Sequence, residues 1–408
     1  MKQNLKTRLN RIRETREKSV SGNIEVSEKK NSNAVETALQ NARETLWSGW
    51  SEAGFKTLKR EISRELSIPV PGVFPKALAI LIPDISRLGR IPSPDELLFF
   101  DLETTGLSGG AGTVAFLAAF GRFVSHGSGS YRLEIVQYLL LDYDGEGDFI
   151  EKIAAEFALT ERAGLMPIVV SYNGKCFDSQ ILKNRCLMNA IAPPELFHAD
   201  LLHPARRLWK QMLPDCSQST VEVSVLGLDR AGDVSGAKAP EIWFSFLRSG
   251  ENRELLSVCD HNEKDITGLA SLFLAMGEIA ASPVESREKY RFNEEAFALN
   301  WNKALKKIPL FFCDAAEQAN KSTNESCTEY AKTGKLLLEN AARNGSPKAA
   351  IILAIDAEWR LRDNSLALHY TDLAMASSGL PDNSIENSID KFAEEVKRRR
   401  LRLLNKIS

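Results

Sequence analysis

Asp101 and Glu103 stand two positions apart, directly after the apolar run at residues 97–100. Residues two apart in a strand point to the same face, so both carboxylates should leave one edge of a buried strand together. Two adjacent carboxylates repel each other, and a divalent metal ion held by hard oxygen ligands relieves that repulsion. By itself the pair is weak evidence, because an acidic strand end that faces water looks the same in a sequence.

Three more residues extend this pair into a possible metal site. Asp178 follows the next apolar strand, at residues 167–172, and is expected at the start of a helix. His261 and Asp265 are four residues apart in a helix predicted at 253–280, and therefore on one face of it. A histidine so placed is a candidate general base. The predicted metal ligands are Asp101, Glu103, Asp178 and Asp265.

With these residues in view, the chain resembles the DEDD (DnaQ-like) superfamily of 3′ to 5′ exonucleases, which have a ribonuclease H-like fold and hold two metal ions with four acids. The resemblance covers residues 96–281. Within the superfamily the chain is most similar to the bacterial YprB-like family, whose members often add a C-terminal helical repeat region. The segments that carry this similarity are DLETTGLSGGAGT from Asp101, YNGK from Tyr172, HADLLHPARR from His198 and HN from His261.

The resemblance implies a two-metal mechanism, with Mg²⁺ or Mn²⁺ as the ions and the 3′ end of single-stranded DNA or RNA as substrate. One ion activates a water for attack on phosphorus, and the other steadies the departing 3′ oxygen. His261 takes the proton from that water. In the histidine branch of the superfamily the base lies one residue further from the last acid; the spacing of His261 and Asp265 is that of the tyrosine branch.

Substrate-binding residues are also implied by the resemblance. Thr104, Thr105 and Leu107 are expected to contact the terminal nucleotide through backbone amides and an apolar wedge, and Asn173 belongs to the same group. A predicted helix places four basic residues on one face, where they would either follow phosphates or form a solvated surface. These residues are His203, Arg206, Arg207 and Lys210. Asp200 precedes that helix and is interpreted as its N-terminal cap rather than as an outer-shell acid.

The elements that must position these residues follow an α/β pattern. Strands are predicted at 97–101, 113–123, 132–142 and 167–172, a helix at 148–163, and helices for the rest up to residue 281. Three adjacent strands followed by alternating helix and strand predict a mixed sheet flanked by helices. We therefore expect a ribonuclease H-like exonuclease domain at residues 96–281.

The flanking regions differ from this domain. Residues 1–34 are charge-dense and predicted to form a disordered basic tail, and residues 35–95 a helical and Pro-rich lead-in. Closely spaced alanines predict an all-α region at 282–408, for which a tetratricopeptide-like repeat and a protein partner are one interpretation. Its last helix ends in the basic cluster KRRRLR from Lys397, where favourable interaction with the helix dipole competes with a nucleic-acid role.

Whole-chain properties limit the function classes. A length of 408 residues exceeds what one core usually serves, so at least two folded units are expected. A net charge of -2 and a pI near 6.3 provide no global positive field, so nucleic acid would need local basic patches. The six cysteines contain no C-x-x-C pair, which favours reduced thiols in the cytoplasm. No apolar run could span a bilayer, and the N-terminus lacks a signal-peptide pattern.

Two rival functions remain open at the level of sequence. The segment GLSGG at 106–110 matches the G-x-S-x-G motif of α/β-hydrolases, with Ser108 as nucleophile. That motif needs a strand before it and a helix after it, whereas the predicted strand ends near Asp101 and β-branched Thr113 and Val114 follow. The second rival is a catalytically inactive module that binds nucleic acid, or a protein through its C-terminal helices. The presence of all four acids argues against it.

Overall fold

The computed structural model describes residues 49–70, 81–82, 92–106, 112–126, 130–162, 167–305, 325–377 and 389–407. The described residues fall into two compact units. The first comprises those of Met1–Gly72, Pro92–Leu202 and Ser217–Ala275, and the second those of Val73–Ile91, His203–Cys216 and Met276–Ser408. The predicted basic tail at 1–34 lies outside the described residues.

A seven-stranded sheet forms the centre of the first unit, in the order β1-β2-β5-β4-β3-β6-β7. The strands are β1 (Trp50–Gly54), β2 (Thr57–Glu65), β3 (Leu97–Thr104), β4 (Ala115–His126), β5 (Ser130–Leu140), β6 (Ile168–Ser171) and β7 (Phe197–Asp200). β6 runs parallel to β3 and to β7, and the other neighbours are antiparallel. The sheet is therefore mixed, which confirms the predicted fold class. The edge strand β1 contains an irregularity in its pairing between Glu52 and Gly54.

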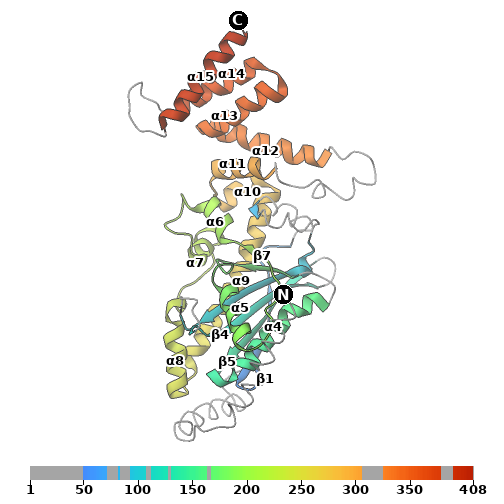
Figure 1. Ribbon diagram of the computed structural model, residues 1–408, viewed down its shortest axis with the longest axis vertical. Helices are drawn as coiled ribbons and strands as arrows, with labels where there is room; N and C mark the ends of the chain where they lie inside the picture. Colours follow the sequence, from blue (N-terminus) through green and yellow to red (C-terminus); the bar gives the residue numbers. More distant parts are fainter. Residues whose placement is uncertain are drawn as a thin grey trace. The chain divides into compact units, whose positions relative to one another are not determined.

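One face of the sheet packs on α4 (Glu146–Arg162) and α5 (Asp178–Met188), which can be followed in Figure 1. Phe100 of β3 meets Phe157 of α4 edge to face, with ring centroids 5.4 Å apart. Residues of α5 belong to the same buried cluster. Burial of this aromatic core supplies the main driving force for assembling the sheet with its helices.

The opposite face packs on α9 (Arg253–Ala281), because alternate residues of β3 point that way. Phe99 meets Phe273 of α9, with ring centroids 5.7 Å apart. The helix comes close to β4: a Cβ placed on Gly121 would lie 2.7 Å from Cγ2 of Ile266. A glycine is therefore required there, and it brings the polar residues of α9 within reach of the sheet.

The structure corrects three parts of the predicted element order. Residues 50–65 of the lead-in form an antiparallel hairpin, not a helix. Leu58 and Ile62 are spaced as on a helix face, but pairing of β2 with β5 satisfies the backbone of this segment. β7 stands where only helices were predicted, because its four residues are half polar and become a strand by pairing with β6. β3 continues beyond Asp101 to Thr104.

Helices form the C-terminal region, as predicted. They are α10 (Pro283–Tyr290), α11 (Glu294–Leu305), α12 (Glu325–Arg343), α13 (Pro347–Asp356), α14 (Asn364–Ser377) and α15 (Ile389–Ile407), with a π-helical turn at Ala357–Leu361. Ser346 caps α13 by accepting a hydrogen bond from the amide of Ala349 at 3.1 Å. Among the described residues, no helix is both long and apolar enough to cross a membrane.

The buried carboxylate of Glu358 holds α15 in place. It accepts hydrogen bonds from Arg399 at 2.6 Å, Arg402 at 2.7 Å and Lys406 at 2.8 Å. Arg400, in the same cluster, pairs with Asp372 of α14 at 2.7 Å. Most of the terminal basic cluster is thus used inside the helical unit, in ion pairs that fix one helix against its neighbours.

Candidate active site

All four predicted acids and His261 line one cavity of about 410 Å³ in the first unit. Leu102, Tyr172, Phe177 and Ile181 add apolar walls, and Thr104, Gly106 and Asn173 add polar ones. The acids come from β3, from the start of α5 and from α9, three elements that are far apart in the chain. The fold therefore brings together the residues that the sequence had only suggested as a set.

Asp101 and Glu103 enter the cavity from β3 on the face covered by α9, since both lie at even spacing from Phe99. Asp101 Oδ2 accepts a hydrogen bond from the side-chain amide of Asn262, with an N–O distance of 2.7 Å. The other oxygen of Asp101 has no hydrogen bond among the described residues. One oxygen is thus fixed, and the other is available to a ligand.

Asp178 is the first residue of α5, and the loop before it has an unusual backbone. Asn173 adopts φ of 67°, the left-handed region that asparagine tolerates better than most residues. A Cβ on Gly174 would lie 2.6 Å from Asp178 Oδ2, so only glycine leaves room for that carboxylate. The loop sequence Asn173-Gly174 is therefore explained by the need to place Asp178.

Asp200 holds this loop from the end of β7. Its Oδ1 accepts from the amide of Asn173 at 2.8 Å and its Oδ2 from the amide of Lys175 at 3.2 Å. The predicted capping contact is present as well, because Oδ1 also accepts from the amide of Leu202 at 3.0 Å. Asp200 thus links the loop before Asp178 to the helix that follows β7.

His261 lies between two carboxylates. Its Nδ1 is 3.0 Å from Asp233 Oδ2, and its Nε2 is 3.2 Å from Asp265 Oδ2. The contact at Nδ1 is a hydrogen bond and the one at Nε2 an ion-pair distance; since a carboxylate only accepts, Nδ1 is the donor to Asp233. Donor atoms of Glu103, His261 and Asp265 all lie within 4.8 Å of one another, close enough to share one metal ion. Sequence reasoning missed Asp233, because a loop aspartate has no spacing pattern that connects it to a histidine on another element.

Arg230 neutralises the fourth acid. Its guanidinium donates to Asp265 Oδ1 at 2.7 Å, to Asp233 Oδ2 at 2.8 Å and to the carboxylate of Glu222. Glu222 is fully buried, and a Cβ on Gly268 would lie 1.8 Å from it, so α9 needs glycine at that position. Burial raises the pKa of Glu222 to about 7, although Arg230 and a hydrogen bond from Gln218 oppose that shift.

The other three acids lack such a partner. No Lys or Arg among the described residues forms an ion pair with Asp101, Glu103 or Asp178. Burial and the neighbouring carboxylates raise the pKa of Asp101 and of Glu103 well above the usual range. Burial and Asp200 raise the pKa of Asp178 to about 7. An added cation would relieve this repulsion.

The predicted substrate-binding residues have mixed placements. Thr104 lines the cavity, and so does Asn173, but Thr105 instead closes the base of the β3–β4 loop through two hydrogen bonds with Val114. Leu107 lies outside the described residues. Arg206 and Arg207 belong to α6 (Leu202–Trp209), in the part assigned to the second unit.

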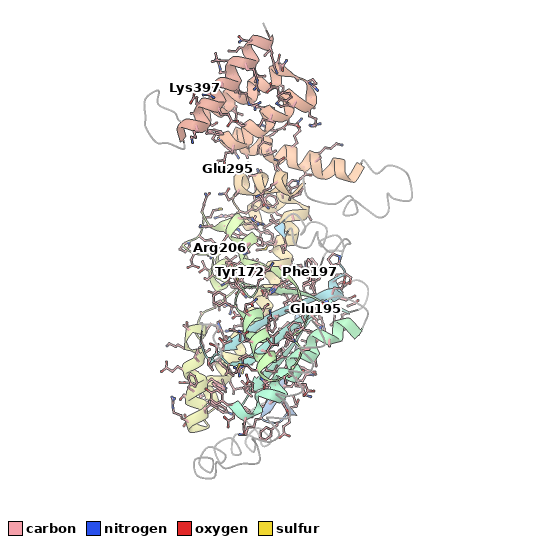
Figure 2. All side chains as sticks on the ribbon, in the orientation of Figure 1. Tyr172, Glu195, Phe197, Arg206, Glu295 and Lys397 are labelled. Atoms are coloured by element: carbon pink, nitrogen blue, oxygen red, sulfur yellow. The ribbon has the colours of Figure 1, made fainter. Side chains whose placement is uncertain are left out.

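Arg206 and Arg207 differ in their surroundings. Both are exposed, and Arg206 is labelled in Figure 2; Arg207 in addition donates to the carbonyl of Leu81 at 2.8 Å. One of the two is therefore tied to the fold. Tyr172 (Figure 2) and Phe177 are aromatic residues at the cavity that the sequence did not mark as substrate contacts.

The G-x-S-x-G interpretation finds no support in the described residues around it. The chain after residue 111 enters the strand β4 at Ala115, not the helix that a nucleophile elbow requires. Ser108 itself lies outside the described residues.

Comparison with known proteins decides the family. A family model of the RNase_H superfamily matches residues 98–276. Over 304 residues the chain is 31% identical to "Uncharacterized protein YprB" of Bacillus subtilis (strain 168), in an alignment that covers 70% of each chain. The chain belongs to the YprB-like family of ribonuclease H-like proteins. This confirms the resemblance to the YprB-like family and the predicted ribonuclease H-like fold. Ribonuclease H-like nuclease domains generally act on nucleic acid with divalent metal ions, which agrees with the acidic and histidine donors at the cavity.

Proposed function

We propose that this YprB-like protein is a metal-dependent nuclease that hydrolyses phosphodiester bonds, as a 3′ to 5′ exonuclease on single-stranded DNA or RNA ends. One observation carries the proposal. Asp101, Glu103 and Asp178 are placed around one cavity without a basic partner among the described residues, beside a histidine held between two carboxylates. A folded protein rarely keeps such repulsion without a cation to bind.

The donor set suits Mg²⁺ or Mn²⁺. Carboxylate oxygens dominate it, and hard oxygen ligands favour these ions over softer metals. Asp101, Glu103, Asp178 and Asp265 would hold two ions. When bound, the ions would lower the pKa of the attacking water and stabilise the charge on the departing 3′ oxygen.

His261 lines the cavity and would accept the proton of the attacking water at Nε2, the ring nitrogen on the side of the proposed metal ligand Asp265. Asp233 holds the proton on Nδ1, and Nε2 would be the accepting atom when the carboxylate of Asp265 is engaged by a metal ion rather than by the ring. After the transfer, the imidazolium has a carboxylate within hydrogen-bonding distance at each nitrogen, Asp233 at 3.0 Å and Asp265 at 3.2 Å. This arrangement supports His261 as the general base, although its spacing from Asp265 is that of the tyrosine branch of the superfamily.

The walls of the cavity support action on a chain end. Tyr172 and the partly exposed Phe177 offer aromatic faces for a base to stack on, a contact worth roughly 1–3 kcal/mol. Thr104 and Asn173 provide polar groups beside the acids. A cavity of about 410 Å³ is in the range of sites for single small ligands, as a terminal nucleotide would be.

The test is a cleavage assay on oligonucleotides labelled at the 5′ end, with Mg²⁺ or Mn²⁺ and with EDTA as control. The proposal expects a ladder of products that shorten from the 3′ end with wild type and not with Asp101→Asn. Glu254→Gln, an exposed acid near the start of α9, is the matched control and should cleave like wild type. Circular single-stranded DNA should stay intact.

Other results would change the proposal in defined ways. Cleavage of the circle would replace exonuclease by endonuclease action. Equal inertness of wild type and Asp101→Asn on all substrates, with nucleic-acid binding retained, would favour the catalytically inactive binding module.

We also propose a cytoplasmic location and a protein partner for the C-terminal helices. Cys186 and Cys259 are buried free thiols, as expected for a chain kept under reducing conditions. Cell fractionation tests the location.

Affinity purification of the full chain, compared with a chain that ends after α11, tests the protein partner. Identical sets of recovered proteins would contradict that proposal.

A further inference from the structure

One row of side chains crosses five strands of the sheet and ends at the first predicted metal ligand. The residues are paired neighbours in register: Trp50 of β1, Arg60 of β2, Gln137 of β5, Ala119 of β4 and Asp101 of β3. Directly paired residues share a face of the sheet, so this row lies under α9. The guanidinium of Arg60 stacks over the ring of Trp50, at 5.3 Å from its centroid.

Hydrogen bonds connect the row to Asp101 through a residue of α9. Arg60 Nε donates to Gln137 Oε1 at 2.8 Å, and Gln137 Nε2 donates to Asn262 Oδ1 at 2.9 Å. Asn262 Nδ2 in turn donates to Asp101 Oδ2 at 2.7 Å. Gln137 and Asn262 are fully buried. We call Arg60, Gln137 and Asn262 the amide relay.

The direction of the amide relay is fixed at one end. An arginine can only donate, so the oxygen of the Gln137 amide must face Arg60. The nitrogen of Gln137 then faces two acceptors, Asn262 Oδ1 and the carbonyl of Cys259, the latter at 2.8 Å. The nitrogen of Asn262 is left to face Asp101. The orientation of an amide is often ambiguous, but here the donor-only guanidinium determines both.

Small residues on β4 allow Asn262 to contact both Gln137 and Asp101. Gln137 and Asp101 lie two strands apart, roughly 10 Å, too far for direct contact. Ala119, between them in the row, is completely buried, and Gly121 on the same face lets α9 approach. The side chain of Asn262 therefore reaches across β4 and joins the two strands.

We propose that the amide relay is a positioning device for Asp101, and that the hairpin of β1 and β2 thereby belongs to the catalytic machinery. This rests on the proposed nuclease function. The relay holds Asp101 Oδ2 with a donor, so the carboxylate presents Oδ1 to the cavity in one orientation. Groups that orient a metal ligand typically change metal affinity or activity by about 10- to 100-fold when they are altered.

Gln137→Glu is the sharpest test, because it keeps size and shape and strengthens the pairing with Arg60. A glutamate accepts but does not donate, so Asn262 must turn its nitrogen to residue 137 and its oxygen to Asp101. We expect kcat to fall about 10- to 100-fold. The Mn²⁺ concentration for half-maximal binding, followed by electron paramagnetic resonance without nucleic acid, should rise by a similar factor.

Variants of Arg60 give a second test of positioning. Arg60→Leu removes the donor that fixes the relay together with the ion pairs of Arg60 with Asp260 and Glu263, whereas Arg60→Lys can still donate to Gln137. The proposal expects Lys to restore Mn²⁺ affinity and kcat to within a few-fold of wild type, and Leu not to. Arg64→Gln is the matched control, since Arg64 is on the same strand and binds Glu263 of α9 without joining the relay. Arg64→Gln should match wild type in both Mn²⁺ affinity and kcat.

The outcomes distinguish this proposal from the proposed function. If wild type cleaves and binds Mn²⁺, and Gln137→Glu and Arg60→Leu do the same at equal thermal stability, the relay is overturned while the nuclease function stands. If wild type neither cleaves nor binds Mn²⁺, the nuclease function fails and the positioning role fails with it. Should Gln137→Glu not fold, the contrast of Arg60→Leu with Arg60→Lys decides the matter.

Discussion

Two buried carboxylates, Glu358 of the helical unit and Asp101 at the cavity of the first unit, have opposite surroundings. Glu358 in the helical unit accepts hydrogen bonds from Arg399, Arg402 and Lys406. Burial acts to raise its pKa, but Lys406 and Arg402 lower it below the usual value. At the cavity, Asp101 lies beside other acids with no basic residue paired to it among the described residues, and its pKa is raised well above the usual range.

This difference separates structural charge from functional charge. A buried acid whose partners come from the chain contributes to holding helices together, and its loss should reduce stability. A buried acid without such partners costs stability, and the chain keeps it only where a ligand supplies the missing charge. Removing the two kinds of acid should therefore have opposite effects on folding and on cleavage.

The largest expected effect is on cleavage by Asp101→Asn. Loss of a direct ligand should exceed the effect of altering a group behind it, so we expect kcat/KM to fall about 1000-fold or more. In EDTA the melting temperature should stay equal or rise, because one repelling charge is gone. A clear drop in the melting temperature of this variant would contradict the comparison.

Glu358→Gln should behave in the reverse manner. It leaves three cations around a neutral group, and we expect a loss of roughly 3 kcal/mol in the free energy of unfolding of the helical unit. Urea unfolding followed by circular dichroism measures it, and cleavage of a short oligonucleotide should be unchanged. Glu394→Gln, which removes an exposed pair with Arg398 on the same helix, is the control and should change stability by less than about 0.5 kcal/mol.

Asp233→Asn sharpens the comparison within the cavity. Asparagine no longer favours the proton on Nδ1, so Nε2 of His261 is a less reliable acceptor. We expect kcat to fall about 10- to 100-fold with little change in KM, because base catalysis contributes only to the chemical step. Steady-state kinetics with saturating Mn²⁺ measures both constants, and a rise in KM alone would argue against His261 as the base.

The smallest expected effect is a pH dependence of stability in EDTA. Asp178 has a pKa of about 7 in the fold, against about 4 in an unfolded chain. The folded state therefore binds more protons between these values, and its stability should fall as pH rises from about 4 to 7. His198, with its pKa lowered to about 4 by burial, contributes with opposite sign below its unfolded pKa.

Comparison of wild type with Asp178→Asn isolates the Asp178 contribution. The difference between their melting temperatures should change across pH 5 to 8, in favour of the variant at the higher pH. Mn²⁺ should reverse that difference, because it should stabilise wild type more than a variant that lacks one of the proposed ligands. Parallel curves for the two proteins in EDTA would show that the repulsion at the cavity is weaker than the geometry implies.

The sequence predicted those parts of the site that depend on local spacing. Asp101 and Glu103 follow an apolar run, and His261 and Asp265 lie four residues apart in a segment with clear helical periodicity. The local spacing was therefore sufficient to select these residues as candidates. Asp178 could be placed at a helix start for the same reason. The structure places all five at one cavity, and their chemical roles stay predictions.

The rest depends on contacts between segments far apart in the chain. Asp233 and Arg230 come from a loop, and nothing in their spacing connects them to His261 and Asp265. The β1–β2 hairpin was interpreted as a helix because its strand character arises from pairing with β5 some 70 residues later. Pairing of this kind overrides local propensity, so a single sequence does not reveal it.

The hairpin also determines what borders the sheet. Its outer strand β1 has 5 residues and β7, at the opposite edge of the sheet, has 4, so both edge strands are short. A chain trimmed to the family-matched residues 98–276 would lose the hairpin and leave β5, with 11 residues, exposed along its length. A long strand with unpaired amides and carbonyls recruits strands from other molecules. The minimal domain should therefore aggregate, and solubility as well as catalysis would require the residues that precede it.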